Sequence, residues 1–131
     1  PFHPVSVPVA GSHISASYFV TGERVVDRSR VDPLRPFDPM RNAWGPGAFE
    51  PFARYSELNL GDTVFKAGLA DANIWTRSIG LTDIGLNWYP TSYIKIYFDW
   101  QHSMYGTPVL LNRDLRSSVN DLFWIRGQLY Y

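Results

Sequence analysis

Residues 119–131 alternate between apolar and polar side chains and end on an aromatic residue. The odd-numbered positions, here called the apolar parity, include Tyr131, Leu129, Gly127, Ile125, Phe123 and Val119. The even-numbered positions, the polar parity, include Gln128, Arg126 and Asn120. Because successive side chains of a strand point to opposite faces of a sheet, this segment is predicted to be a β-strand with two different environments. The alternation leaves open which solvent meets the apolar face.

Alternation also occurs in earlier segments, and the ten prolines and ten glycines break the chain between them. We therefore predict an all-β fold, an antiparallel up-and-down meander of about five strands. The predicted strands lie near 13–22, 47–59, 77–89, 93–104 and 119–131, with long loops at 24–46, 60–76 and 105–118. Strand parity puts the 24–46 loop at the end of the sheet where the turns are short, so either it is a long turn at that end or the number of strands differs from five.

The strongest local unit is a predicted hairpin of 79–89 and 93–104, with a turn at Pro90, Thr91 and Ser92. If Tyr89 pairs with Tyr93, every apolar residue of one face meets a suitable partner. These pairs are Trp88 with Ile94, Leu86 with Ile96, Ile84 with Phe98, and Thr82 with Trp100. The other face would hold Asn87 with Lys95, Gly85 with Tyr97, and Asp83 with Asp99. A shift by one residue would mix the two faces, so the sequence specifies the register.

Composition excludes several classes of function. Basic and acidic residues are equal in number, at 12 each, and no basic cluster occurs, which argues against a nucleic-acid partner. The chain has no cysteine, so disulfides, thiolate zinc sites and cysteine nucleophiles are excluded. The longest uncharged run, Pro1–Gly22, is interrupted by Pro4 and Pro8, and we predict no transmembrane helix.

We predict that the chain is not an enzyme and has no cofactor or metal. Its histidines are His3, His13 and His102, and His102 shares the parity of Phe98 and Trp100, away from the polar face. No G-x-S-x-G motif is present. Histidine, aspartate and glutamate do not cluster at metal-ligand spacing, and the acidic stretch around Asp27 lacks the calcium-loop pattern.

Two classes of β protein fit the alternation. In a soluble β-sandwich, such as a carbohydrate-binding module, the apolar parity points into a closed core. In a transmembrane β-barrel the apolar parity meets lipid and the polar parity lines a lumen. Aromatic residues near the strand ends favour the barrel, because interfacial girdles are built this way. These residues are Trp88, Tyr89, Trp100, Tyr105, Tyr130 and Tyr131.

Four short blocks in order carry a family resemblance. They are Tyr18–Glu23, Gly47–Glu50, Ala53–Ser56 and Gly85–Tyr89. Together with the aromatic C-terminal residue, they resemble the C-terminal part of the phosphate-selective porin O and P family. The resemblance covers roughly residues 12–131, although the terminal residue is Tyr rather than the commoner Phe.

The resemblance implies part of a bacterial outer-membrane barrel of about sixteen strands that passes small polar or anionic solutes, with phosphate among the candidates. It also implies outer-membrane lipid as a partner, recognition of the C-terminal strand by the barrel-assembly machinery, and a homotrimer. About five strands cannot close a barrel around water, since barrels begin at about eight, so the chain is expected to be a C-terminal segment that needs the missing N-terminal strands. The family's anion-selecting constriction is built largely by that earlier part, so phosphate selectivity does not carry over.

Strand parity gives the candidate site residues. The pore-lining candidates are Glu50, Arg54, Asp83, Asn87, Lys95, Tyr97, Asp99, Arg126 and Gln128. The candidates for the lipid-facing surface and aromatic girdle are Tyr18, Tyr55, Trp88, Ile96, Phe98, Trp100, Phe123, Ile125, Leu129 and Tyr131. Rings of charge set the selectivity of pores.

Each functional interpretation has a structural alternative. Arg54, Lys95 and Arg126 can instead pair across strands with the acidic residues to stiffen the wall. Tyr97 either lines the solute path or covers the gap left by Gly85. The basic residues of the predicted loops either attract anions at an entrance or belong to solvated loops. These residues are Lys66, Arg77, Arg113 and Arg116.

Overall fold

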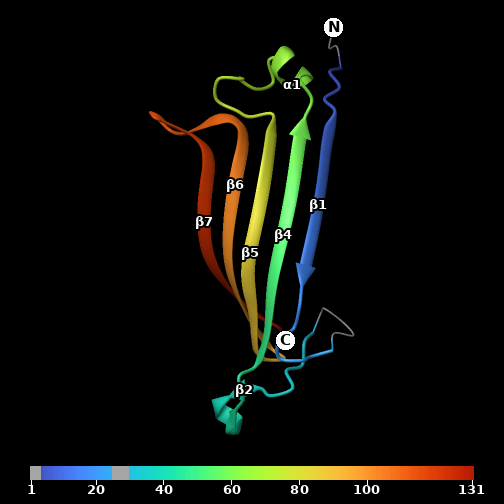
Figure 1. Cartoon of the computed structure of the whole chain (residues 1–131), viewed down its shortest axis with the longest axis vertical. Helices are drawn as coiled ribbons and strands as arrows, with labels where there is room; N and C mark the ends of the chain where they lie inside the picture. The colour runs from blue at the N-terminus through green and yellow to red at the C-terminus, as the bar shows by residue number, and fades with distance from the viewer. Residues whose placement is uncertain (1–3, 25–29) are drawn as a thin grey trace. The chain divides into compact units, whose positions relative to one another are not determined.

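A computed structural model describes residues 4–24 and 30–131. Five long strands form one antiparallel sheet in the order β1-β4-β5-β6-β7, with β1 and β7 at its edges (Figure 1). Their bounds are β1 Val9–Ser17, β4 Ala48–Leu60, β5 Ser78–Thr91, β6 Ile94–Asn112 and β7 Leu115–Leu129. The remaining elements are β2 Phe37–Asp38, η1 Pro39–Arg41, β3 Ala43–Trp44 and α1 Thr63–Lys66. The predicted all-β meander is confirmed.

The chain divides into two compact units, each of which includes a part of every long strand. Each unit is named here after one of its residues. The Glu50 unit comprises Ser15–Ala53, Asp83–Trp100 and Phe123–Tyr131. The Arg54 unit comprises Pro1–Ile14, Arg54–Thr82 and Gln101–Leu122.

The predicted loop at 105–118 is wrong. Strand β6 continues to Asn112, and β7 starts after a two-residue turn. Gly106 lies beside Ser78, the first residue of β5, because a Cβ on Gly106 would collide with Ser78 Oγ. Beyond this point β6 has passed the start of its neighbour, so Pro108 is tolerated where no ladder hydrogen bond from β5 is needed. Pro108 therefore lies inside β6, beyond the start of β5, and does not end the strand.

The turn of the central hairpin lies later than predicted. Strand β5 runs through Pro90 to Thr91, and the turn residues are Ser92 and Tyr93. The Thr91 hydroxyl accepts a hydrogen bond from the Tyr93 amide at 3.2 Å. Tyr93 thus belongs to the turn, and the predicted pair of Tyr89 with Tyr93 is wrong.

Arg30, in the long connection between β1 and β4, contacts the β5–β6 turn. Arg30 donates to Ser92 Oγ at 3.3 Å, and its guanidinium lies 4.9 Å from the centroid of the Tyr93 ring. The first strand starts and ends earlier than predicted, at Val9 and Ser17. Residues 25–29 of the predicted 24–46 loop, with the acidic stretch around Asp27, lie outside the described part of the chain.

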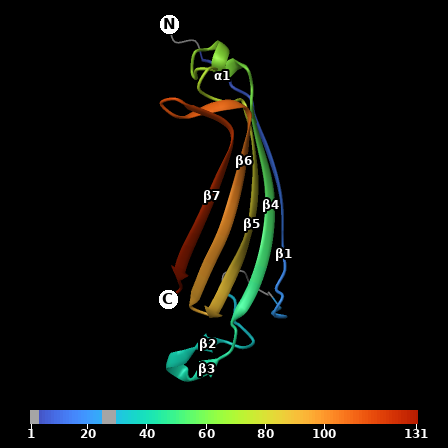
Figure 2. The ribbon, with the colours of Figure 1, turned by 60° about the vertical axis from the view of Figure 1, so that its left-hand side comes forward.

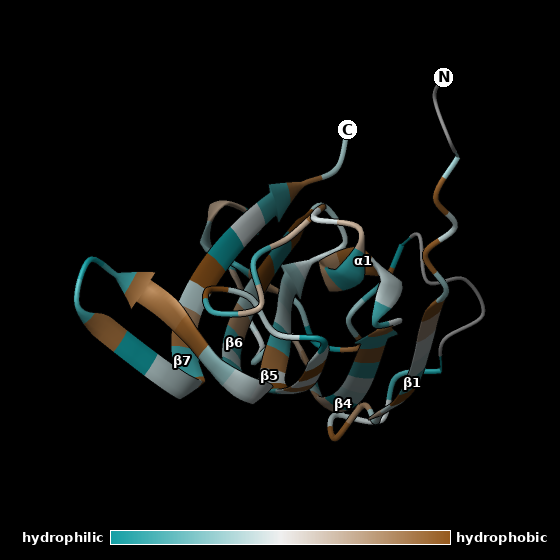
Figure 3. Cartoon of the chain, turned by 90° about the horizontal axis from the view of Figure 1, so that it is seen from above, coloured by the Kyte–Doolittle hydropathy of each residue, from teal (hydrophilic) through white to brown (hydrophobic). Residues whose placement is uncertain are grey.

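Polar and apolar residues alternate along the strands, as the teal and brown bands of Figure 3 show. In the Glu50 unit the usual burial of a soluble protein is reversed. Acidic and amide side chains are buried, whereas large apolar side chains of β7 are exposed, at 76% for Phe123, 71% for Ile125 and 73% for Leu129. The buried polar residues of this unit are Glu50, Asp83, Asn87 and Asp99. A small apolar cluster of Phe19, Val31, Ala48 and Tyr89 completes its core.

Candidate channel wall

Glu50 is the centre of a hydrogen-bond network in the Glu50 unit. Its carboxylate accepts bonds from Ser17 Oγ at 2.7 Å, Asn87 Nδ2 at 2.9 Å and the Tyr89 hydroxyl at 2.8 Å. The side chain is buried in β4, and its donors come from the strands on both sides, β1 and β5. The arrangement fixes the carboxylate within the wall. A buried carboxylate with three donors joins strands more than it attracts solutes.

Tyr97 holds two cations of the same unit. Lys95 Nζ lies 4.1 Å from the centroid of its ring, and Arg126 Cζ lies 5.7 Å from it. The Tyr97 hydroxyl donates to Gln128 Oε1 at 2.7 Å. Lys95 Nζ is also 4.9 Å from the ring of Tyr89. The structure therefore brings together four of the predicted pore-lining residues, with the ring of Tyr97 at their centre.

Phe52 covers Gly85, the gap for which Tyr97 was the predicted cover. A Cβ on Gly85 would lie 2.6 Å from the ring of Phe52 and would collide with the carbonyl oxygen of Phe98. Only a glycine allows this approach of ring and backbone. Phe52 was overlooked because it is an aromatic residue on the polar parity, and that departure from the pattern was the available signal.

The remaining predicted pore-lining residues differ in exposure. Asp83 and Asp99 are buried in the Glu50 unit, while Arg126 is exposed. The proposed cross-strand pairing of these aspartates with arginine stays a prediction. Ser17 and Tyr89 belong to the network although they were not among the pore-lining candidates. Tyr89 was assigned to an aromatic girdle, but its bond to Glu50 puts it on the polar side.

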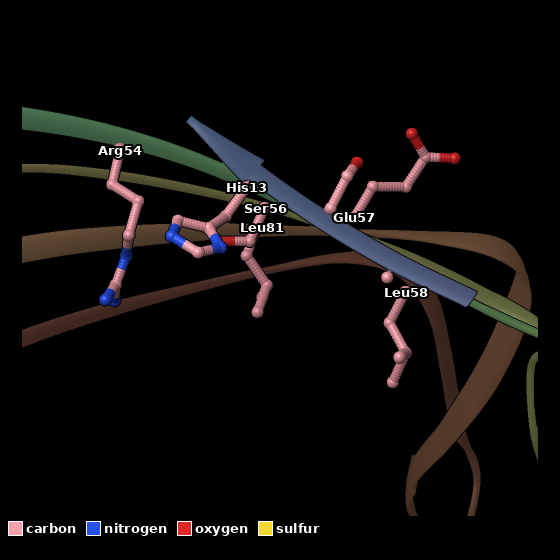
Figure 4. A pocket seen from close by; sticks show the side chains of 8 residues that line it. His13, Arg54, Ser56, Glu57, Leu58 and Leu81 are labelled. Carbon is pink, nitrogen blue, oxygen red and sulfur yellow. The ribbon is translucent and has the colours of Figure 1, made fainter. Parts of the chain in front are cut away.

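The Arg54 unit presents its polar side differently. A cavity of about 380 Å³ lies over β1, β4 and β5. Figure 4 shows Arg54, His13 and Ser56 extending to one side of the strands, with Glu57 on the other side. The cavity lining comprises Gly11, Ser12, His13, Arg54, Ser56, Glu57, Leu58 and Leu81. Arg54 is exposed to solvent.

Apolar side chains gather on the other face of the Glu50 unit. Trp100 stacks on Phe123 at 6.3 Å, and Trp88 stacks on Phe49 at 6.0 Å. Phe98 and Tyr18 are also exposed, whereas Ile96 and Trp88 are half-buried. In the Arg54 unit Tyr55 is exposed and lies over Gly80, where a Cβ would be 3.2 Å from its hydroxyl. Tyr131 is fully exposed.

One polar pair interrupts the apolar parity in the Arg54 unit. His102 Nδ1 lies 2.8 Å from Asp121 Oδ1, on the neighbouring strand β7. Both residues lie on the apolar parity of their strands. Asp121 is thus a polar exception to the alternation of residues 119–131. Pairing lowers the cost of placing two ionisable groups on an apolar face.

The basic residues of the connections are exposed. Arg77 forms an ion pair with Asp62, at the two ends of the segment that contains α1. Arg113 lies in the turn between β6 and β7, and Arg116 lies within β7 rather than in a loop. Over residues 4–24 and 30–131, His, Asp and Glu form no group of three suited to a metal ion. Within the same ranges, the helices lack the length and apolar character that a membrane span requires.

Comparison with protein families identifies the chain. The family model described as phosphate-selective porin O and P matches residues 6–130. The chain belongs to this family. Neither the curated proteins nor the solved structures contain a match. The predicted family is confirmed.

Membership of the porin O and P family indicates a channel of the bacterial outer membrane rather than an enzyme. The exposure pattern agrees with such a channel. Phe98, Ile125 and Leu129 are exposed instead of being packed in a closed core. The soluble β-sandwich, which requires that core, is therefore unsupported.

Proposed function

We propose that this chain forms part of the wall of a water-filled channel for the passive diffusion of small polar or anionic solutes. Its polar side faces the water and its apolar side faces lipid. The observation that supports this proposal most is the reversed burial of the Glu50 unit, in which polar side chains bond to one another and apolar ones remain exposed. A soluble protein would gain free energy by burying that apolar surface, whereas lipid covers it in a membrane.

The wall requires further strands. Strands β1 and β7 are the edges of the five-stranded sheet, and each unpaired backbone group in lipid costs several kcal/mol. Barrels begin at about eight strands. We propose that the chain is the C-terminal segment of one barrel domain, that N-terminal strands pair with both edges, and that the barrel-assembly machinery recognises β7. Assembly of such barrels into a homotrimer belongs to the same proposal.

The charges of the wall support weak rather than strong ion selectivity. Glu50 accepts three hydrogen bonds from within the sheet, and Lys95 lies between two rings. Arg54 is exposed and lines a cavity together with His13 and Ser56. We propose that Arg54 contributes most to anion attraction within this chain, with phosphate among the solutes.

Adjacent residues of β7 provide the experiment that tests the channel. The full porin that carries this chain is made with one cysteine, either Ile125→Cys or Arg126→Cys, and is reconstituted in phospholipid vesicles. We expect a fluorophore on Ile125→Cys to be quenched by brominated acyl chains. Arg126→Cys should react with a membrane-impermeant thiol reagent. Reaction of both with the reagent, and quenching of neither, would overturn the proposal.

Selectivity is tested by Arg54→Gln in planar bilayers. We expect the permeability ratio of chloride to potassium to fall by about twofold, because a lumen charge acts directly on permeating ions. Lys95→Gln should change the ratio less, since its charge is held against two rings. Arg113→Gln, in the β6–β7 turn, serves as the matched control. An unchanged ratio in Arg54→Gln would remove Arg54 from the solute path.

A further inference from the structure

A small hairpin in the connection between β1 and β4 has a defined structure. Strands β2 and β3 pair Phe37 with Trp44, and Asp38 caps η1 by accepting from the Arg41 amide at 3.3 Å. Asn42 follows in the left-handed conformation, with φ 55°, which closes the turn. The amide of Gly45 donates to the Pro36 carbonyl oxygen at 2.9 Å. The residues at the tip are therefore held in place rather than loosely presented.

The hairpin is joined to the apolar side of the sheet by a series of rings in the Glu50 unit. Phe37 lies 6.0 Å from Trp44 and 6.0 Å from Trp88, and Trp88 stacks on Phe49. Trp88 Nε1 also donates to the Pro46 carbonyl oxygen at 2.8 Å. Figure 2 shows β2 and β3 just beyond the ends of β4 and β5. The hairpin thus continues the aromatic surface that the proposed function assigns to lipid.

Gly47 makes this junction possible. Its φ of 76° is in the left-handed region, and a Cβ there would lie 2.8 Å from Trp88 Nε1 and 2.5 Å from the Tyr89 carbonyl oxygen. A larger residue would separate the hairpin from Trp88. The close approach is a built feature of the sequence, not an accidental contact.

The hairpin exposes two large apolar residues beside Arg41, whose guanidinium forms an ion pair with Asp38 at 3.6 Å. Met40 is 98% exposed and Trp44 is 68% exposed, and the Arg41 side chain between them is 78% exposed. Trp is enriched where membrane meets water, because its ring is apolar and its N–H is polar. A nearby Arg is attracted to anionic phosphates of lipid headgroups. The three residues have the chemistry of an interfacial anchor.

We propose that the β2–β3 hairpin inserts Met40 and Trp44 into the phospholipid headgroup region of the leaflet next to the β5–β6 turn. The inference rests on the proposed channel function. Continuity with the lipid-facing rings is the argument for lipid as the occupant. A protein partner is disfavoured, because stable interfaces bury about 800 Å² on each side, far more than two side chains provide.

The experiment measures the depth of the tip in the full porin, reconstituted in vesicles of phosphatidylethanolamine and phosphatidylglycerol. The chain has no cysteine, so Met40→Cys can carry a polarity-sensitive fluorophore at one position of this segment. We expect a spin label on the lipid headgroup to quench it about twofold more than a label at the acyl-chain end. Asp114→Cys, at the exposed β6–β7 turn, is the matched control and should be quenched by aqueous iodide.

Two further variants make the outcome decisive. Trp44→Ser should reduce headgroup quenching at Met40→Cys, because the second anchoring residue is lost. Quenching of Met40→Cys by iodide alone, or by neither lipid nor iodide as under a protein cover, would overturn the lipid anchor. The Ile125→Cys fluorophore is measured in parallel. If acyl-chain labels quench Ile125→Cys but no lipid label quenches Met40→Cys, only the anchor fails, whereas loss of both signals contradicts the channel itself.

Discussion

The two units of the sheet use their polar residues in opposite ways. In the Glu50 unit the carboxylate of Glu50 is buried and receives three hydrogen bonds from neighbouring strands. In the Arg54 unit Arg54 opens into a cavity, and the carboxylate of Asp62 forms its ion pair with Arg77 at the exposed surface. The Glu50 carboxylate is therefore buried within the wall, whereas the Asp62 carboxylate lies at the surface.

This difference shows that charges counted along a strand do not measure the charge a solute would meet. The sequence presents Glu50, Lys95 and Arg126 as equivalent members of a mixed lumen wall. In the structure neutral donors surround Glu50, and Tyr97 lies against both cations. In a buried network of this kind the low dielectric strengthens each hydrogen bond, and it makes an unpaired polar group costly. The following substitutions test whether the two units differ in stability as they differ in bonding.

The largest effect is expected from Glu50→Ala. It leaves Ser17, Asn87 and Tyr89 without their shared acceptor, and hydrogen bonds to charged groups contribute about 1.5–3 kcal/mol each, net of the bonds that water would offer. We expect the free energy of unfolding of the full porin to fall by about 3 kcal/mol, measured by urea titration in vesicles with tryptophan fluorescence.

Glu57→Ala is the matched control in the other unit. Glu57 is exposed and accepts from Asn59 Nδ2 at 2.8 Å, two residues along the same strand. Glu57→Ala should lower the free energy of unfolding by less than about 0.5 kcal/mol, as is usual for surface substitutions. Equal losses in the two variants would contradict the contrast between the units.

A smaller loss is expected from Gly85→Ala, which tests the packing of the polar side. The added methyl would collide with the Phe52 ring and with the Phe98 carbonyl oxygen, so we expect a loss of about 2 kcal/mol in the same titration. Gly127→Ala is its control, because no described atom outside its chain neighbours lies within 4 Å of the added carbon. Tolerance of both substitutions would show that Phe52 does not cover Gly85 in the membrane.

Tyr97→Leu should have a more modest effect. The substitution removes the ring between Lys95 and Arg126, and partly exposed cation–π contacts contribute about 0.5–1 kcal/mol each. We expect Tyr97→Leu to lower the free energy of unfolding by about 1 kcal/mol. Tyr97→Phe keeps the ring and loses only the hydrogen bond to Gln128, so its effect should be smaller. If Tyr97→Phe is as damaging as Tyr97→Leu, the hydroxyl rather than the ring is the stabilising group.

The faces of the sheet could be predicted from the sequence, because a period of two survives along each strand. The contacts of Tyr97 with Lys95, Arg126 and Gln128 fall on the polar parity as expected. Strand ends were harder to predict. Strand β6 continues through Pro108 because this residue lies beyond the start of β5, and the position of that start is information from another strand.

The site was predictable only where alternation is regular. Phe52 lies on the polar parity, and its role depends on a glycine that is far away in sequence and close in space. The β2–β3 hairpin was assigned to a loop, because the ring contacts of Phe37 with Trp88 that hold it come from a strand about fifty residues later. Local patterns carry no signal for such contacts.

The smallest effect on stability is expected at Asp62. Its ion pair with Arg77 is exposed, unlike the buried network of Glu50, and its contribution depends on pH. The hydrogen bond and charge of Arg77 lower the pKa of the Asp62 carboxyl below its ordinary value of 3.8. A lowered pKa means that the pair stabilises its segment above the ordinary value, and that this stabilisation disappears as pH falls through the lower one. Above about pH 5 no change is expected, since the carboxylate is ionised whether or not the pair forms.

NMR titration of the Asp62 carboxyl in the folded porin, with Arg77→Gln as the comparison, measures this pair directly. The Asp62 pKa should rise toward its ordinary value in Arg77→Gln, because the neighbouring cation that lowers it is gone. Urea stability should change little, since exposed ion pairs contribute little. An unchanged pKa in that variant would show that the pair does not persist in solution, and the Arg54 unit would then have no stable ion pair between Asp62 and Arg77.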